Sequence, residues 1–241
     1  QGLGDSMQFV RYAFELVKRG FSISLCTQAK LHPLINHSCS EIKLLSIDEA
    51  KQTAEGTWLP LLSLPQLLNI SPGNPLITNA YIHTNEELRL KWKHLIQKED
   101  LPVIGINLQG NPKAEQYGLK GRSFPLEALA PVAQLFEAKL LSLQKGFGTE
   151  QLITCSFRED FVKCQNMVDQ TWNFLETAAI ISNCDLIITN DTAIAHLAGG
   201  MGKPTWLLLQ KIPDWRWGLE SETSFWYPSM RLFRQSKSGN W

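Results

Sequence analysis

The second half of the chain alternates short apolar segments with polar turns and helical segments, and this alternation is the strongest constraint on the fold. Segments typical of strands span 103–108, 139–143, 185–189 and 205–209, and helical patterns span 125–137, 174–183 and 193–200. Strands that alternate with helices in this way pair in parallel, and helices cover both faces of the sheet. We therefore predict that residues 101–241 form a doubly wound, Rossmann-like α/β domain.

The first half shows the same rhythm over a shorter length. A helical pattern follows the opening glycines, segments 21–26 and 41–47 are typical of strands, and 86–98 is typical of a polar helix. A strand normally precedes a glycine-rich opening turn of this kind. We therefore expect a second Rossmann-like domain over residues 1–98 that lacks its first strand, in a chain that is a fragment, with a boundary at 98–102.

Composition limits the classes of partner. A chain of 241 residues with 44% hydrophobic residues has enough apolar side chains for two small domains with proper cores. Its 23 basic and 23 acidic residues balance, which argues against nucleic acids or anionic membranes held by bulk electrostatics. No apolar run is long enough for a membrane span and no signal peptide opens the sequence, so we expect a cytoplasmic protein.

The cysteines predict neither disulfides nor a zinc site. They form no CxxC pair and lack metal-ligand spacing, and we interpret them as buried or idle thiols: Cys26, Cys39, Cys155, Cys164 and Cys184.

Polar residues gather where the predicted strands of the second half end. These loops hold Gly110 and Asn111, Lys145, residues 190–192, and residues 213–217. Ligands of open α/β sheets bind beyond the carboxyl ends of the strands, and a helix start with a nearby cation suits a phosphate. The predicted ligand of this edge is therefore a phosphate-containing molecule.

Plainer interpretations of the same residues stay open. Asp191 or Thr192 can serve only to cap the following helix, and Lys145 can be a solvated charge. His196 lies one turn into that helix, where spacing alone favours packing. Glu176 lies in the first helical turn, where the helix dipole favours an acid in any case.

The opening Gly2-Leu3-Gly4-Asp5 turn is the second candidate site. Its glycines permit close approach of a ligand, and Asp5 stands at a helix start. The position of Met7 weakens a dehydrogenase interpretation, and no GxxxxGK[ST] motif occurs. The chain also has no DxD pair, so we expect no protein-held metal. Cations and backbone amides are then expected to neutralise a bound diphosphate.

A long ordered series of motifs resembles the glycosyltransferase-like region that follows tetratricopeptide repeats in many bacterial proteins. That region is in turn similar to the heptosyltransferases, family nine of the glycosyltransferases. The likeness is strongest at 190–199, and the series comprises residues 1–12, 60–65, 110–112, 122–123, 142–145, 177–179, 190–199, 203–204, 214–217, 226–228 and 231–235.

The resemblance implies a GT-B fold, in which two Rossmann-like domains face a cleft. It implies that Asp5 is the general base and that the start of the 193–200 helix holds the donor phosphates and sugar. The residues implied in donor binding are Gly110, Asn111, Arg122, Lys145 opposite the diphosphate, Glu176 near the ribose, Asp191, Thr192, Ala193 and His196. Ala193 replaces a glycine of the family, and Asn190 stands where an apolar or small residue is usual.

The function implied is an inverting, metal-independent transfer of a sugar from a nucleotide-diphosphate sugar to a hydroxyl of a glycan or protein, without a cofactor. Tetratricopeptide repeats in the same parent chain are the implied neighbours. Two alternatives remain open on the same fold: a non-catalytic glycan- or nucleotide-binding module, and a sugar-nucleotide epimerase. The residues do not predict the donor base, the transferred sugar, the acceptor or the oligomeric state.

Overall fold

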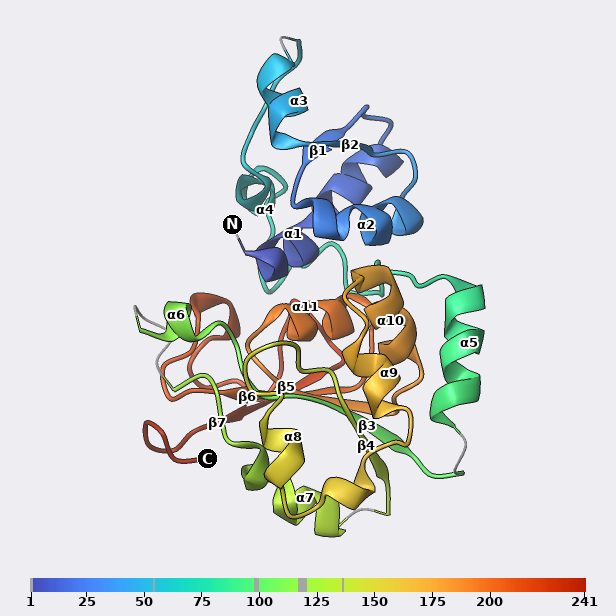
Figure 1. The fold of residues 1–241 in the computed structure, drawn as a ribbon. Helices are drawn as coiled ribbons and strands as arrows, with labels where there is room; N and C mark the ends of the chain where they lie inside the picture. Colours follow the sequence, from blue (N-terminus) through green and yellow to red (C-terminus); the bar gives the residue numbers. More distant parts are fainter. Residues whose placement is uncertain (1, 54, 98–99, 117–120, 136) are drawn as a thin grey trace.

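The computed structural model describes residues 2–53, 55–97, 100–116, 121–135 and 137–241 (Figure 1). In the second half, five parallel strands form one sheet in the order β4-β3-β5-β6-β7. The strands are β3 (Val103–Asn107), β4 (Lys139–Ser142), β5 (Leu186–Asn190), β6 (Thr205–Leu209) and β7 (Met230–Arg234). The chain builds outward from β3 to β4 and then returns to place β5 on the other side of β3. The predicted α/β fold with parallel strands is confirmed.

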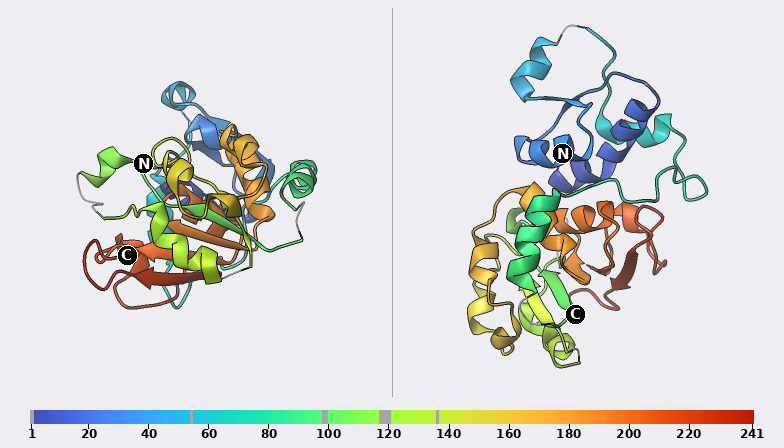
Figure 2. Two further views of the ribbon diagram at one scale, coloured as in Figure 1. Left: turned by 60° about the horizontal axis from the view of Figure 1, so that its bottom comes forward. Right: turned by 90° about the vertical axis from the view of Figure 1, so that its right-hand side faces the viewer.

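Helices cover both faces of this sheet (Figures 1 and 2). Alternate strand residues point to opposite faces: Leu141 and Ile187 join the larger apolar cluster, whereas Leu140 and Ile188 join the smaller one. The larger cluster includes residues of α9 (Gln165–Asp169), α10 (Phe174–Ser182) and α11 (Ala193–Gly200). The smaller cluster packs against η3 (Leu126–Leu129), α7 (Ala130–Leu135) and α8 (Gln151–Thr154).

The first half forms a smaller α/β unit above α11 in Figure 1. Its two strands pair in parallel, as the alternation predicts. The elements are α1 (Leu3–Lys18), β1 (Ser24–Cys26), η1 (Ala29–Leu31), α2 (His32–Ser38), β2 (Lys43–Leu45), α3 (Ile47–Gln52), η2 (Leu61–Ser63) and α4 (Leu64–Leu67).

Two helices of the first 100 residues pack against the second half. The predicted polar helix is α5 (Glu86–Ile96), which packs against α10 and buries Trp92. Helix α1 packs against α11, and residues of both belong to the same larger apolar cluster, including Met7 and Leu197. One hydrophobic core therefore runs from α1 to the sheet.

Three features of the second half differ from the sequence-based prediction. Residues 125–137 were expected to form one helix, but η3 is followed by a separate α7, because Pro131 has no amide hydrogen to continue an α-helix from Leu126. Strand β7 was not predicted; its buried Met230 and Leu232 alternate with Arg231 in the pattern of a strand. Short helices interrupt predicted loops: α6 (Pro112–Glu115), α8, η4 (Arg158–Asp160), α9 and η5 (Trp215–Trp217).

Parts of the predictions fall outside the described residues. Gln1, Lys98, Glu99 and Phe136 belong to these parts, and they include the core of the predicted domain boundary. Within the described ranges, no helix combines the length and the apolar character needed to cross a bilayer.

Candidate functional site

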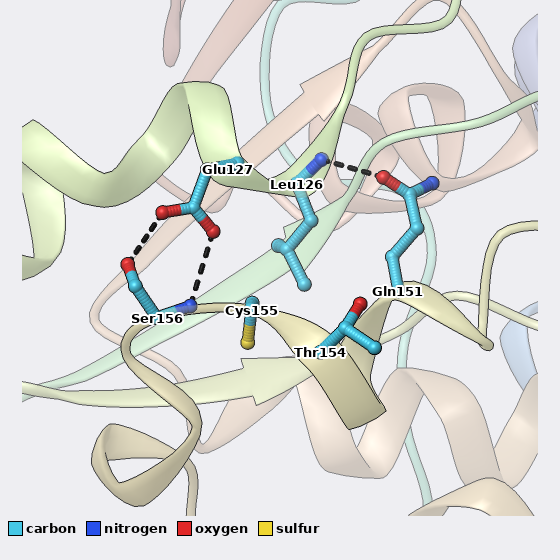
Figure 3. Close-up of a pocket in the computed structure, with 6 residues that line it drawn as sticks. All are labelled: Leu126, Glu127, Gln151, Thr154, Cys155 and Ser156. Atoms are coloured by element: carbon cyan, nitrogen blue, oxygen red, sulfur yellow. Dashed lines mark hydrogen bonds between the residues drawn. The ribbon is translucent and has the colours of Figure 1, made fainter.

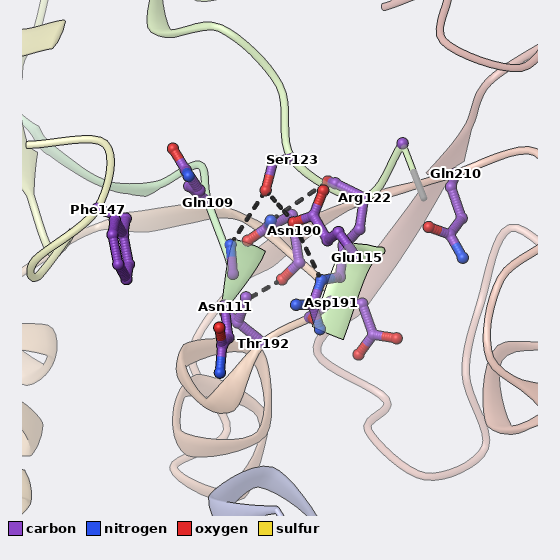
Figure 4. Close-up of polar contacts among 12 residues, drawn as sticks. Gln109, Asn111, Glu115, Arg122, Ser123, Phe147, Asn190, Asp191, Thr192 and Gln210 are labelled. Atoms are coloured by element: carbon purple, nitrogen blue, oxygen red, sulfur yellow. Dashed lines mark hydrogen bonds and ion pairs between the residues drawn. The ribbon is translucent and has the colours of Figure 1, made fainter. Parts of the chain in front are cut away.

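Four of the predicted donor residues lie where the strand order of the sheet reverses. Strand β3 ends at Asn107 and its neighbour β5 ends at Asn190, so the loops that follow diverge from adjacent strands (Figure 4). The first loop carries Gly110 and Asn111, and the second carries Asp191 and Thr192. This edge of a doubly wound sheet is where such folds bind ligands.

Asn190 holds the two loops together. Its side chain is fully buried, and its Nδ2 donates to the carbonyl oxygens of Leu108 at 3.1 Å and Arg122 at 3.2 Å. Asn107 Nδ2 donates in turn to Asn190 Oδ1 and to Thr192 Oγ1, both at 3.0 Å. An apolar residue at position 190 could not make these bonds, which gives a physical reason for an asparagine at this position.

Helix α11 begins without a side-chain cap. Thr192 occupies the N-cap position, but its hydroxyl bonds with Asn107 and with the carbonyl oxygen of Asn190 rather than with an amide of the first turn. The plainer interpretation, that this residue serves to cap the helix through its side chain, is therefore wrong for Thr192. The positive end of the helix dipole remains available to an anion, and Ala193 adds little bulk there.

Arg122 lies across the glycine of the first loop. Its Nη1 donates to the carbonyl oxygen of Asp191 at 3.2 Å, and its Nε lies 3.8 Å from Glu115 Oε1. A Cβ atom at position 110 would lie 2.0 Å from Arg122 Nη2, so only glycine permits this arrangement. Asn111 bonds locally, accepting from the amide of Lys113 at 3.0 Å. The loop thus brings a guanidinium beside the start of α11.

His196 faces the first half of the chain and is buried. Its Nδ1 lies 2.9 Å from the Tyr227 hydroxyl, and its Nε2 lies 3.9 Å from Asp191 Oδ1. Burial, together with Arg216 and Arg11, lowers the pKa of His196 well below its ordinary value, so the ring is neutral. The plainer packing interpretation accounts for part of this, because the ring also stacks on Trp217.

Asp191 is a second titratable group of this edge, and its side chain is 14% exposed. Burial raises the pKa of its carboxyl group above the ordinary value, whereas Trp217 and Arg216 act in the opposite direction. Burial therefore disfavours the negative charge of the Asp191 carboxylate, and the positive charge of Arg216 offsets part of this effect.

Asp5 lies in the first turn of α1, close to His196 of α11. A Cβ atom on Gly4 would lie 2.6 Å from His196 Cδ2, so the helix start touches the imidazole. Asp5 Oδ1 accepts from Arg216 Nη2 at 2.7 Å, a bond between residues at opposite ends of the chain. The two candidate sites of the sequence are therefore one site.

Arg216 is the functional candidate that the sequence-based selection missed. It lies in η5, after β6, and its Nη1 is 3.4 Å from Asp214 Oδ1. The available signal was its position in the 213–217 loop, which was predicted to lie at the same strand edge.

Two predicted donor residues point elsewhere. Lys145 Nζ donates to the carbonyl oxygen of Val168 in α9, and burial lowers the pKa of this lysine. Glu176, at the start of α10, accepts from Lys91 Nζ at 2.6 Å and from Trp92 Nε1 at 3.1 Å. Both roles remain predictions.

The hollow shown in Figure 3 lies against η3 and α8, the elements of the smaller apolar cluster, and has a volume of about 370 Å³. Its polar groups bond to one another: Glu127 accepts from the amide of Ser156 at 3.1 Å, and Gln151 accepts from the amide of Leu126 at 2.8 Å. None of the predicted donor residues lines it. In the described part of the chain, no three His, Cys, Asp or Glu residues group as metal ligands.

The neutral state of His196 predicts a pH dependence of stability. Below about pH 6.5 the unfolded histidine binds a proton that the folded chain excludes, so acidification from pH 7 to pH 5 removes stability by up to about 1.4 kcal/mol per pH unit. Urea unfolding at both pH values should show a smaller loss in His196→Asn than in the wild type. Equal losses in the two proteins would contradict the buried, neutral assignment, and the comparison cancels the opposite contribution of Asp191.

Comparisons with known proteins concern the family and the fold of the chain. Residues 148–214 match a family model described as glycosyltransferase family 9 (heptosyltransferase). Protein FlbA of Caulobacter vibrioides is 24% identical over an alignment of 269 positions, which covers 100% of this chain and 43% of that protein. The chain thus spans less than half the length of this curated relative.

Two solved structures are similar along the chain. The ADP-heptose LPS heptosyltransferase II of E. coli has a TM-score of 0.65 and 13% identity, with 100% of this chain and 90% of that chain covered. A glycosyltransferase family 9 structure from Veillonella parvula has a TM-score of 0.64 and 13% identity, with 98% and 84% covered. The chain therefore has the α/β fold of the GT-B heptosyltransferase structures, and its segment 148–214 matches the glycosyltransferase family 9 model.

Proposed function

We propose that this chain is the catalytic region of an inverting, metal-independent glycosyltransferase that moves a sugar from a nucleotide-diphosphate sugar to a hydroxyl of a glycan or protein. The observation that carries the proposal is the meeting of Asp5 with the uncapped start of α11, through Gly4 against His196 and Arg216 against Asp5. The carboxylate can accept the proton of the acceptor hydroxyl, and the helix start can hold the leaving diphosphate, which are the two roles that this reaction needs.

In the proposed step, the acceptor hydroxyl oxygen attacks the anomeric carbon from the face opposite the diphosphate. A new carbon–oxygen bond forms, and the bond from the anomeric carbon to the phosphate oxygen breaks with its electron pair leaving on the diphosphate. Asp5 accepts the proton of the hydroxyl. A single displacement inverts the anomeric configuration.

The leaving diphosphate gains negative charge, which fixed positive groups stabilise. The start of α11, at Thr192 and Ala193, supplies backbone amides and the helix dipole. Arg122 supplies a full charge beside that start, held over Gly110. These groups, with Lys145, take the place of a protein-held metal in the proposal.

The remaining assignments belong to the same proposal. Glu176 is assigned to the nucleotide ribose and Asn111 to the donor loop. The reaction needs no cofactor beyond the donor, and we place it in the cytoplasm, in a parent protein that carries tetratricopeptide repeats.

A thermal-shift screen against nucleoside diphosphates and nucleotide sugars tests the donor site directly, since a ligand of the folded state raises the melting temperature. Product analysis with the donor that shifts most then separates the alternatives. Transfer to an acceptor supports the proposal, epimerised donor without acceptor indicates an epimerase, and binding without turnover indicates a binding module.

Lys145→Ala is expected to weaken nucleoside diphosphate binding about tenfold, the effect of losing one charge-assisted contact of about 1.4 kcal/mol. Titration calorimetry measures it, with Lys51→Ala as the control, because Lys51 lies on α3 and pairs with the exposed Asp48. Equal affinity in Lys145→Ala and the wild type would remove Lys145 from the donor site.

A further inference from the structure

We propose that Arg216 is a shared cation, which holds Asp5 in the ligand-free chain and passes to the donor diphosphate, thereby freeing Asp5 to accept the proton of the acceptor. The inference rests on the proposed function and adds to it a residue that contacts the diphosphate and couples donor binding to the general base.

Both oxygens of Asp5 are engaged in this structure. Oδ1 accepts from Arg216 Nη2 at 2.7 Å, and Oδ2 accepts from the amide of Gly2 at 2.9 Å. The second bond is local to the helix start, whereas the first comes from the other end of the chain. The acceptor site on Oδ1 that the guanidinium occupies is not open to an acceptor hydroxyl, so release of Arg216 is the change that would expose it.

The guanidinium of Arg216 is positioned for exchange between partners. Its side chain is only 9% exposed, and its buried Nε has no hydrogen-bond partner among the described residues. The backbone is held on both sides: the amide donates to Asp214 Oδ1 at 3.1 Å, and the carbonyl oxygen accepts from Trp226 Nε1 at 3.1 Å. The guanidinium also lies 5.3 Å from the centre of the Trp215 ring. Its Nη1 also lies 3.4 Å from Asp214 Oδ1, so the guanidinium contacts two carboxylates, and the proposed exchange moves this group while the backbone stays in place.

The same guanidinium already acts on the start of α11. It bonds Asp5, whose neighbour Gly4 touches His196 in the first turn of α11, and His196 Nε2 lies 3.9 Å from Asp191 Oδ1 just before that helix. A diphosphate bound at this start would therefore lie within electrostatic reach of Arg216. Two oxygens of a phosphate can accept together from the planar guanidinium, and a diphosphate carries more negative charge than one carboxylate.

Competition for one cation predicts a coupling between Asp5 and the diphosphate. Removing the charge of Asp5 in Asp5→Asn should tighten binding of a nucleoside diphosphate about fivefold or more, the lower end of typical coupling between sites. Arg216→Gln should weaken the same binding about tenfold. In the Arg216→Gln background, Asp5→Asn should then change the affinity less than twofold, because the shared cation is gone.

The experiment is calorimetric titration of the wild type, both single variants and the double variant with ADP, GDP, CDP and UDP, using the tightest of the four. The melting temperature of each variant verifies its folding, and Arg216→Met, which removes the charge but keeps much of the side-chain length, replaces Arg216→Gln if that variant does not fold. Equal tightening by Asp5→Asn in both backgrounds reflects only long-range charge and overturns the exchange, as does no change in either background. If no nucleoside diphosphate binds the wild type or any variant, the proposed function itself fails.

Discussion

Asp5→Ala is expected to lower the rate of sugar transfer by about 10²–10⁴-fold, the usual contribution of a general base. The carboxylate stands at the start of α1 where the helix touches His196, and it is the acid that the first half offers to the helix start of the second. Without it, the hydroxyl proton must go to water while the new bond forms. The affinity for nucleoside diphosphate should not fall, because the variant removes a competitor for Arg216.

The measurement is the initial rate at saturating donor and acceptor, with the melting temperature as a check on folding. Asp48→Ala is the matched control, because Asp48 lies on α3 with a side chain that is 85% exposed, and it should keep the wild-type rate. An unchanged rate in Asp5→Ala would remove this residue from the chemistry and, with it, the mechanistic core of the proposed function.

Arg11→Ala is expected to lower the free energy of unfolding by about 3–5 kcal/mol, the range for truncating a large buried side chain and leaving its partners unpaired. Arg11 is 1% exposed; it donates to the carbonyl oxygen of Trp226 at 2.7 Å and to the Tyr81 hydroxyl at 3.0 Å. Its guanidinium lies between the rings of Tyr81 and Tyr227, 4.4 and 4.5 Å from their centres. Truncation leaves the carbonyl oxygen of Trp226 without this hydrogen-bond donor and opens a cavity between the two halves.

Urea unfolding measures this difference. Arg19→Ala is the control on the same helix segment: Arg19 is 43% exposed and pairs with Glu15, so its loss should cost about 0–1 kcal/mol. A loss in Arg11→Ala no larger than that in Arg19→Ala would show that the Arg11 network does not hold the halves together.

The sequence predicted the parts of the fold that depend on local pattern. The strands at 103–108, 139–143, 185–189 and 205–209 correspond to observed strands within one or two residues, because each is a short apolar run bounded by turn residues. Strand β7 was missed because its aromatic neighbours suggested packing rather than pairing. The helix at 125–137 was predicted too long because the apolar spacing was given more weight than Pro131.

The candidate site could be predicted only as a set of loops. Carboxyl ends of parallel strands share an edge, so Asn111 and Asp191 could be placed together from the strand pattern alone. The bond between Arg216 and Asp5 spans 211 positions and has no local signature. The direction of individual side chains could not be predicted from the sequence either. The side chains of Lys145 and Glu176 turn toward α9 and α5, and only the packing of these helices explains it.

The apolar cluster shared by α1 and α11 restricts how far the two halves of the chain can separate. Swinging the first half away would bring Met7, Leu197 and the Arg11 guanidinium into water together, at a cost far above that of rotating one surface side chain. Separation of the two halves by a hinge motion therefore carries a large free-energy cost, so the core of the protein itself keeps Asp5 beside the start of α11.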